Sequence, residues 1–207
     1  ASQADYSPVL DANESTTSTK RATVHIHGCN NTIEDVFGGG DAAAAYGVAS
    51  IVDGGRFNRV FGGGNGEVTE ANIGAGGTNL VVHGGKINTL FGGSNTQGTI
   101  TGAMGITVDN EGPCPGEMDI DEFFCGNNLA NIGTPSNPVN ISATIGCGTK
   151  FGNVYGGCNQ ADIYGNVTLT IKGGEMDNVY GGSKGANPAA NASDEEKAAA
   201  AADINGL

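Results

Sequence analysis

A seven-residue pattern, hydrophobic-x-x-Val-aromatic-Gly-Gly, recurs along this 207-residue chain, with Leu in place of Val in one copy and one degenerate copy. Its aromatic positions are Phe37, Phe61, Phe91, Phe124, Tyr155 and Tyr180, which are separated by 24, 30, 33, 31 and 25 residues. Self-similarity at such a period is typical of solenoids, in which each repeat buries its apolar face against the next. The repeat therefore constrains the fold before any other feature does.

Each repeat holds three short apolar segments, and each segment ends in glycine. Apolar and polar residues alternate within the first segment, as in Val24-His25-Ile26-His27, and this period of two indicates a strand. The 37 glycines argue against helices, where each costs about 1 kcal/mol, and suit sharp corners. We therefore predict an all-β, right-handed parallel β-helix of about six coils with three strands in each coil.

Stacked coils would place equivalent residues in columns about 4.8 Å apart. One column, predicted to face inward, contains Ile26, Val52, Val82, Val108, Ile145 and Ile171. The aromatic column is predicted to form a buried ladder. A further column, with Asn65, Asn95, Asn128 and Asn159, is predicted to form an amide ladder in the left-handed backbone conformation that Asn tolerates. Asp35 and Arg59 fall at equivalent positions and should pair across coils.

The chain divides into three parts by composition. Residues 1–22 form a polar lead-in or N-terminal cap, and residues 23–182 hold the coils, with an insertion at 109–138. Residues 183–207 form a loop with a short Ala-rich helix, capped by Ser193, and the start of a further coil. This last echo of the repeat predicts a fragment of a longer solenoid.

The formal net charge of −13 argues against nucleic acid and anionic membrane surfaces as partners. Apolar runs of about 18 residues are lacking, so we expect no membrane insertion. Few lysines, no tryptophan and abundant Gly, Asn and Thr are typical of a secreted or cell-surface bacterial protein. The composition thus predicts an extracellular location.

The signature Gly-Gly-x-hydrophobic-x-x-Val-Phe/Tyr-Gly-Gly-x-Asn resembles the glycine-rich β-helix repeats of bacterial surface and adhesin-like proteins. The resemblance covers about 160 residues and implies a non-catalytic scaffold that presents loops to host or microbial glycans or surface proteins. It also extends to the pectate-lyase-like superfold, which implies the alternative of a polysaccharide lyase or glycoside hydrolase. The chain has no recognisable lyase motif, so this second likeness stops at the fold.

One column beside the first glycine pair alternates basic and acidic residues. It reads His27, Asp53, His83, Asp109, Gly146 and Lys172. His and Asp on adjacent coils could share a ligand or a metal ion, or could respond to protons. The alternative is a solvated face with weak exposed pairs. His27, Asp53, His83 and Asp109 are the candidate binding residues.

The insertion is rich in acids. Asp119, Asp121 and Glu122 are candidate carboxylates for glycoside hydrolysis, which needs two carboxyl groups roughly 5–9 Å apart. Asp109, Glu111, Asp119 and Asp121 are candidate calcium ligands, and calcium is the one cofactor that the sequence suggests. A solvated acidic loop explains the same run without any ligand. A lyase would also need a base, and Arg56, Arg59 and Lys86 lie two coils away.

The chain has five cysteines and no CxxC pair, which argues against zinc ligation by thiolates. Cys114 and Cys125 flank one loop, and Cys147 and Cys158 flank one strand-turn segment. Either pair could form a disulfide, which would leave Cys29 unpaired. Alternatively, the cysteines are buried small residues at the corners.

Overall fold

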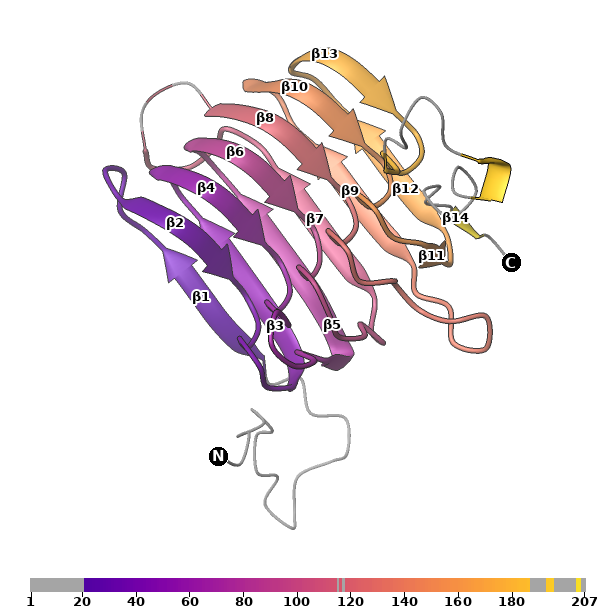
Figure 1. Ribbon diagram of the computed structural model, residues 1–207. Helices are drawn as coiled ribbons and strands as arrows, with labels where there is room; N and C mark the ends of the chain where they lie inside the picture. Colours follow the sequence, from indigo (N-terminus) through magenta and orange to yellow (C-terminus); the bar gives the residue numbers. More distant parts are fainter. Residues whose placement is uncertain (1–20, 115, 117, 187–192, 196–203, 206–207) are drawn as a thin grey trace.

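The computed structural model describes residues 21–114, 116, 118–186, 193–195 and 204–205, and it is a parallel β-solenoid of about five turns (Figure 1). All strand pairs within its sheets are parallel and join equivalent repeats. The first sheet contains, in spatial order, β1 (Ala22–Ile26), β3 (Ala45–Val52), β5 (Ile73–Val82), β7 (Met104–Val108), β9 (Ile141–Ile145) and β12 (Val167–Ile171).

The second sheet forms the opposite wall. It contains β2 (Thr32–Phe37), β4 (Arg56–Phe61), β6 (Lys86–Phe91), β8 (Met118–Phe124), β10 (Thr149–Tyr155) and β13 (Glu175–Tyr180). The third wall is thinner. It consists of the pair β11 (Ile163–Tyr164) and β14 (Ile204–Asn205) and of single bridges that join Ile73 to Ile100 and Ile132 to Ile163.

The predicted parallel stacking is confirmed, and Val52 and Val82 are register partners, as the repeat required. The prediction of about six coils was wrong by one. Six strands in a wall enclose about five turns, because a turn closes only when the chain returns over its own start. The predicted third strand is reduced to a bridge in most turns. The right-handed sense stays a prediction, and the predicted helix after Ser193 falls largely outside the described residues.

The core runs up the inside of the coil. Val52, Val82, Val108 and Ile145 of the predicted inward column are completely buried. Ile171, in the last strand of the first sheet, is 41 % exposed because no described strand lies beyond it. The inward column is therefore confirmed wherever a turn lies on both sides of it.

The aromatic column forms a continuous stack, and the predicted burial is confirmed for the inner rings, whereas Tyr180 at the end is 46 % exposed. Ring centroids of successive members are 4.7–5.0 Å apart and the planes lie within 11° of parallel. Val60 and Phe61 are both completely buried although they are adjacent in a strand. The rings form a cluster of their own, separate from the main core. The corner thus buries a residue on each side of the second sheet.

The amide ladder is also confirmed. The Nδ2 groups of Asn95, Asn128 and Asn159 each donate to Oδ1 of the Asn in the preceding turn at 2.8 Å. Asn65, the first Asn of the column, donates to Asp41 Oδ1 at 2.7 Å. The predicted left-handed conformation was wrong, because every described residue with positive φ is a glycine. Gly66, at φ +65°, is one of the residues that make the turns instead. The predicted pairing of Arg59 with Asp35 is confirmed by two hydrogen bonds.

The disulfide joins Cys29 to Cys114, so both predicted pairings were wrong. The loop after β7 runs back over the earlier turns, and Cys114 lies against Gly54, where a Cβ would be 2.7 Å from its Sγ. Cys125 and Cys158 are buried free thiols, as the alternative predicted, and Cys147 is exposed. Burial raises the pKa of Cys158 to about 12 and also raises that of Cys125, so both thiols stay protonated and inert.

No helix in the described part of the chain is long and apolar enough to cross a membrane.

Loss of the disulfide should destabilise the first turns. The cross-link closes a loop of 85 residues, and removal of a native disulfide typically costs about 2–5 kcal/mol. We expect the double variant Cys29→Ser/Cys114→Ser to lose stability in this range by urea unfolding. Cys147→Ser removes an exposed free thiol and should change stability by less than about 0.5 kcal/mol. Equal stability of the two variants would contradict the role of the cross-link.

Removal of one buried amide should be costly. Asn95 is 5 % exposed, donates to Asn65 and accepts from Asn128. Asn95→Ala leaves both neighbours with an unmade hydrogen bond, so we expect a loss of about 1–3 kcal/mol. Asn88→Ala is the matched control, because Asn88 also donates to an Asn of the preceding turn but is exposed. Thermal unfolding of both variants tests the difference.

Candidate metal centre

The column of alternating His and Asp lies where the strands of the first sheet end. Backbone hydrogen bonds continue the ladder through it, from Asp53 N to Ile26 O at 2.9 Å and from His83 N to Val52 O at 2.8 Å. The positions after each strand therefore stay in register although they are no longer strand residues. This rigid ladder determines which side chains meet.

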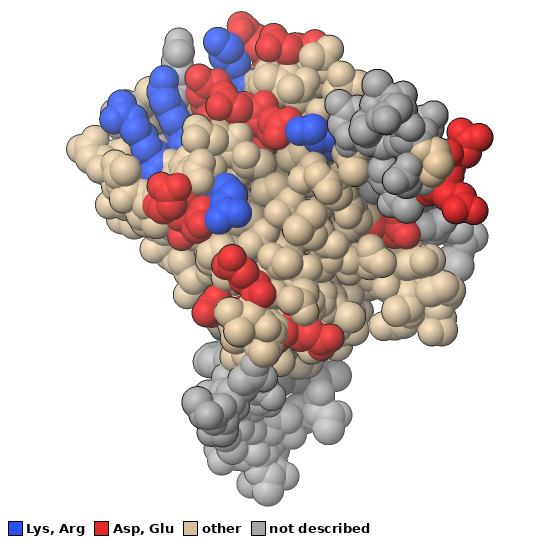
Figure 2. Space-filling view, viewed as in Figure 1, with Lys and Arg blue, Asp and Glu red and all other residues tan. Residues whose placement is uncertain are grey.

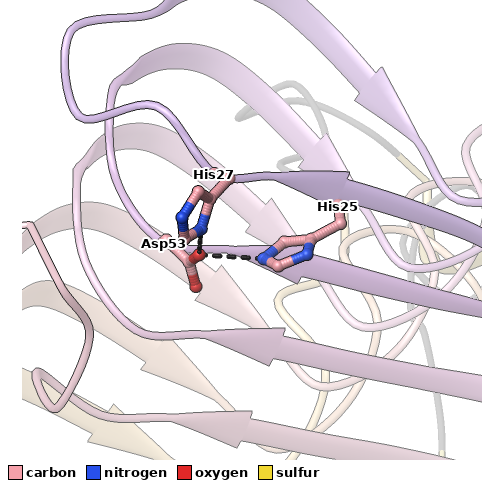
Figure 3. A group of neighbouring side chains, drawn as sticks. All are labelled: His25, His27 and Asp53. Atoms are coloured by element: carbon pink, nitrogen blue, oxygen red, sulfur yellow. Dashed lines mark hydrogen bonds and ion pairs between the residues drawn. The ribbon is translucent and has the colours of Figure 1, made fainter.

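Asp53 is the centre of a three-residue cluster (Figure 3). Its Oδ2 lies 2.5 Å from His27 Nδ1 and 2.8 Å from His25 Nε2. The aspartate is 4 % exposed, whereas the side chains of His25 and His27 are 46 % and 74 % exposed. Two imidazoles of the first turn thus cover a carboxylate of the second.

His25 was missing from the candidates. Its register partner in β3 is Ile51, so a comparison of equivalent positions pairs it with an apolar residue. The signal that could have found it is the spacing His-x-His, because residues two apart in a strand point to the same side. Figure 3 shows both rings turned toward Asp53 from that side.

Two opposing effects set the pKa of Asp53. Burial raises it, whereas the hydrogen bonds from His27 and His25, together with the charges of these rings when protonated, lower it. The net result is a pKa below the ordinary value, so the carboxylate is ionised at neutral pH. A buried carboxylate that stays charged is a good ligand for a cation.

The second predicted pair is also in contact. His83 Nδ1 lies 2.6 Å from Asp109 Oδ1, and the same oxygen accepts a hydrogen bond from the Glu111 backbone N–H at 3.2 Å. Within the described residues, however, this pair has no third ligand atom close enough to share a metal ion. The column therefore splits into a cluster of three and a pair.

The cluster of three has the donors that a transition metal requires. Its two imidazole nitrogens and one carboxylate oxygen lie within 4.8 Å of one another. Around tetrahedral zinc, ligand atoms lie about 3.3 Å apart, given Zn–N and Zn–O distances of 2.0–2.2 Å. The two short contacts to Asp53 would have to widen by roughly 0.5–0.8 Å by this measure, and rotation of the exposed rings allows it.

The acidic candidates lie elsewhere. Asp119, Asp121 and Glu122 belong to β8 in the second sheet, and Glu122 accepts from Lys184 at 2.7 Å. Asp109 and Glu111 follow β7 in the first sheet. The described residues bring the histidine cluster together, and they do not gather three ligand atoms from this acidic set. Calcium binding and carboxylate catalysis by these residues stay predictions.

No protein-family model, curated protein or solved structure matches the chain.

The lowered pKa of Asp53 makes stability depend on pH. A carboxyl group whose pKa is lower in the folded state stabilises the fold above its unfolded pKa, near 3.9, and this contribution is lost as the pH falls further. We expect the stability difference between the wild type and Asp53→Asn to shrink as the pH falls below about 4. Urea unfolding between pH 7 and 2.5 measures it. Asp121→Asn is the control, because Asp121 is an exposed residue of β8 and its loss also removes one negative charge. The same pH dependence in this variant would contradict the assignment of the effect to Asp53.

Proposed function

We propose that this chain is a non-catalytic, extracellular scaffold whose first turns hold a transition-metal ion, with Zn²⁺ the best match, through His25, His27 and Asp53. The observation that carries the proposal is the convergence of three ligand atoms within 4.8 Å. Among the described residues, no other group of three His, Cys, Asp or Glu side chains converges in this way.

The donor types favour zinc over calcium. Imidazole suits Zn²⁺, Cu²⁺ and Ni²⁺, whereas Ca²⁺ takes six to eight oxygen ligands. Three protein ligands leave a fourth tetrahedral position for water or for a group from another molecule. The exposed imidazoles place that position on the solvent side of the cluster. Such a centre suits a surface that attaches to a glycan or to another protein through the metal.

The location of the cluster supports a structural role as well. His25 and His27 belong to the first turn, whose strand β1 is the edge of the first sheet, and Asp53 follows β3. Within the described residues, a metal ion would join β1 to β3, the strand beside it in that sheet. Extracellular placement is supported by the Cys29–Cys114 disulfide, because such bonds persist in oxidising compartments.

Zinc should bind to the oxidised chain and stabilise it. At a free concentration one hundred times its dissociation constant, a ligand that binds only the folded state stabilises it by about 2.7 kcal/mol. We expect His25→Ala, His27→Ala and Asp53→Asn each to weaken zinc binding at least tenfold in calorimetric titrations. Binding should also weaken in acid, because protons compete for the imidazole nitrogens.

His83→Ala is the matched control, since it removes a histidine from the same column without touching the cluster. This variant should bind zinc like the wild type. The proposal fails if the double variant His25→Ala/His27→Ala keeps the affinity of the wild type, or if Ca²⁺ binds as tightly as Zn²⁺ at the same site.

A further inference from the structure

The Cys29–Cys114 disulfide lies beside the residues of the metal centre. Cys29 comes two residues after His27 in the first turn, and in the second turn Gly54 follows Asp53 directly. A Cβ at Gly54 would lie 2.7 Å from Cys114 Sγ and 3.4 Å from Cys29 Cα. The bonded cysteines therefore pack on the residue next to the buried carboxylate, and one of them belongs to the corner that carries an exposed imidazole.

The disulfide is the covalent restraint on this corner, which joins β1 to β2. At the far end of the corner, Arg56 N donates to Asn31 O at 2.8 Å. Inside it, Asn31 Nδ2 donates to Gly28 O at 3.1 Å, and the disulfide holds Cys29. The position of His27, one residue before Gly28, therefore depends on how firmly these contacts hold the corner.

The other end of the cross-link is seated on the third turn. Cys114 belongs to the loop after β7, in which Gly112 N donates to His83 O at 3.3 Å and Glu111 N donates to Asp109 Oδ1 at 3.2 Å. Gly112 has no room for a side chain, because a Cβ would lie 2.6 Å from His83 Cβ. The disulfide thus ties the first turn to a loop that is held by contacts two turns away.

The three ligands differ in how well the solenoid itself holds them. Asp53 is 4 % exposed and follows β3, which has β1 on one side and β5 on the other. His25 and His27 belong to the first turn, whose strands β1 and β2 are each the last of their sheet among the described residues. The imidazoles therefore rely more than the carboxylate on any additional restraint, and the disulfide supplies one.

We infer that this disulfide is a redox switch for the metal centre, which binds Zn²⁺ when the bond is closed and at least tenfold more weakly when it is reduced. The inference rests on the zinc function proposed above. A centre whose ligands are held in place binds more tightly than one whose ligands must first be ordered. Release of Cys29 removes the covalent restraint from the corner, so His27 is no longer held over Asp53.

The switching reaction needs a dithiol as reductant. One thiolate of the dithiol attacks a sulfur atom of the protein disulfide and forms a mixed disulfide, and the second thiol of the reductant then displaces the protein sulfur. Two electrons and two protons pass to Cys29 and Cys114, and the reductant leaves as a cyclic disulfide. Cys29 is exposed, which gives the reductant access to the bond.

Calorimetric titration with Zn²⁺ tests the switch on the oxidised chain and on the chain reduced with a dithiol and then freed from it by gel filtration without oxygen. We expect at least tenfold weaker binding by the reduced chain, and the same weak binding by Cys29→Ser/Cys114→Ser. Circular dichroism should show that both keep the fold. Absence of zinc binding by the oxidised chain would refute the proposed function and the switch together. Equal affinity in the two states would refute the switch alone, as would tighter binding by the reduced chain or loss of its fold.

Two variants serve as controls. Cys147→Ser removes an exposed free thiol and keeps the disulfide, so it should lose affinity on reduction as the wild type does. If reduction had no effect on this variant, Cys147 would be the responsive group and the proposal would be wrong. Figure 2 shows acidic side chains at several places on the visible face, where a cation can bind weakly. His27→Ala keeps every acid and measures this background.

Reciprocity supplies a second measurement that does not depend on titration of the reduced chain. If the disulfide strengthens zinc binding, zinc must stabilise the disulfide by the same factor. A tenfold ratio of affinities corresponds to a reduction potential lower by about 30 mV at saturating zinc. Equilibration in redox buffers at fixed free zinc should show this shift in the wild type and none in His27→Ala. An unchanged potential in the wild type would overturn the inference.

Discussion

The stacking of one turn on the next, with equivalent residues about 4.8 Å apart, is the constraint on which the rest of this structure depends. Each side chain lies against its equivalent above and below, so a column must hold groups that pack well on their own copies. Phenyl rings do so, with centroids as close as 4.7 Å. Amides do so as well, because each carries a donor and an acceptor that continue the chain of hydrogen bonds.

Titratable residues cannot follow the same rule, and the solenoid places them by alternation. In the column after the first sheet, His27 meets Asp53 and His83 meets Asp109, so each acid has a basic partner one turn away. Alternation also lets Asp53 be buried, since a buried carboxylate needs hydrogen-bond donors for its charge. The addition of His25, from the same side of β1, turns such a pair into three potential ligands. The metal proposal thus rests on His25, a second imidazole beside Asp53 that the alternation of acids and bases in the column does not require.

The sequence predicted well which residues stack on one another in successive turns. It predicted poorly the contacts between residues that do not occupy equivalent positions. Phe61, Asn95 and Val52 were placed correctly because the repeat fixes which residues are equivalent, and equivalence fixes contact. The pairing of Cys29 with Cys114 could not be found in this way, because it depends on the direction of a loop whose residues have no equivalents in other turns. His25 was missed for a related reason, since it contacts Asp53 diagonally and not through its register partner.

Arg56 and Lys86 are register partners of like charge, and Lys86 has the acidic Asp119 as its partner on the other side. Elsewhere, charged neighbours in register alternate or pair, as Arg59 does with Asp35 and as Lys150 does between two acids. Like charges directly opposite each other destabilise a sheet. The acid beyond Lys86 restores the alternation one strand later, so this cost is confined to a single step of the column.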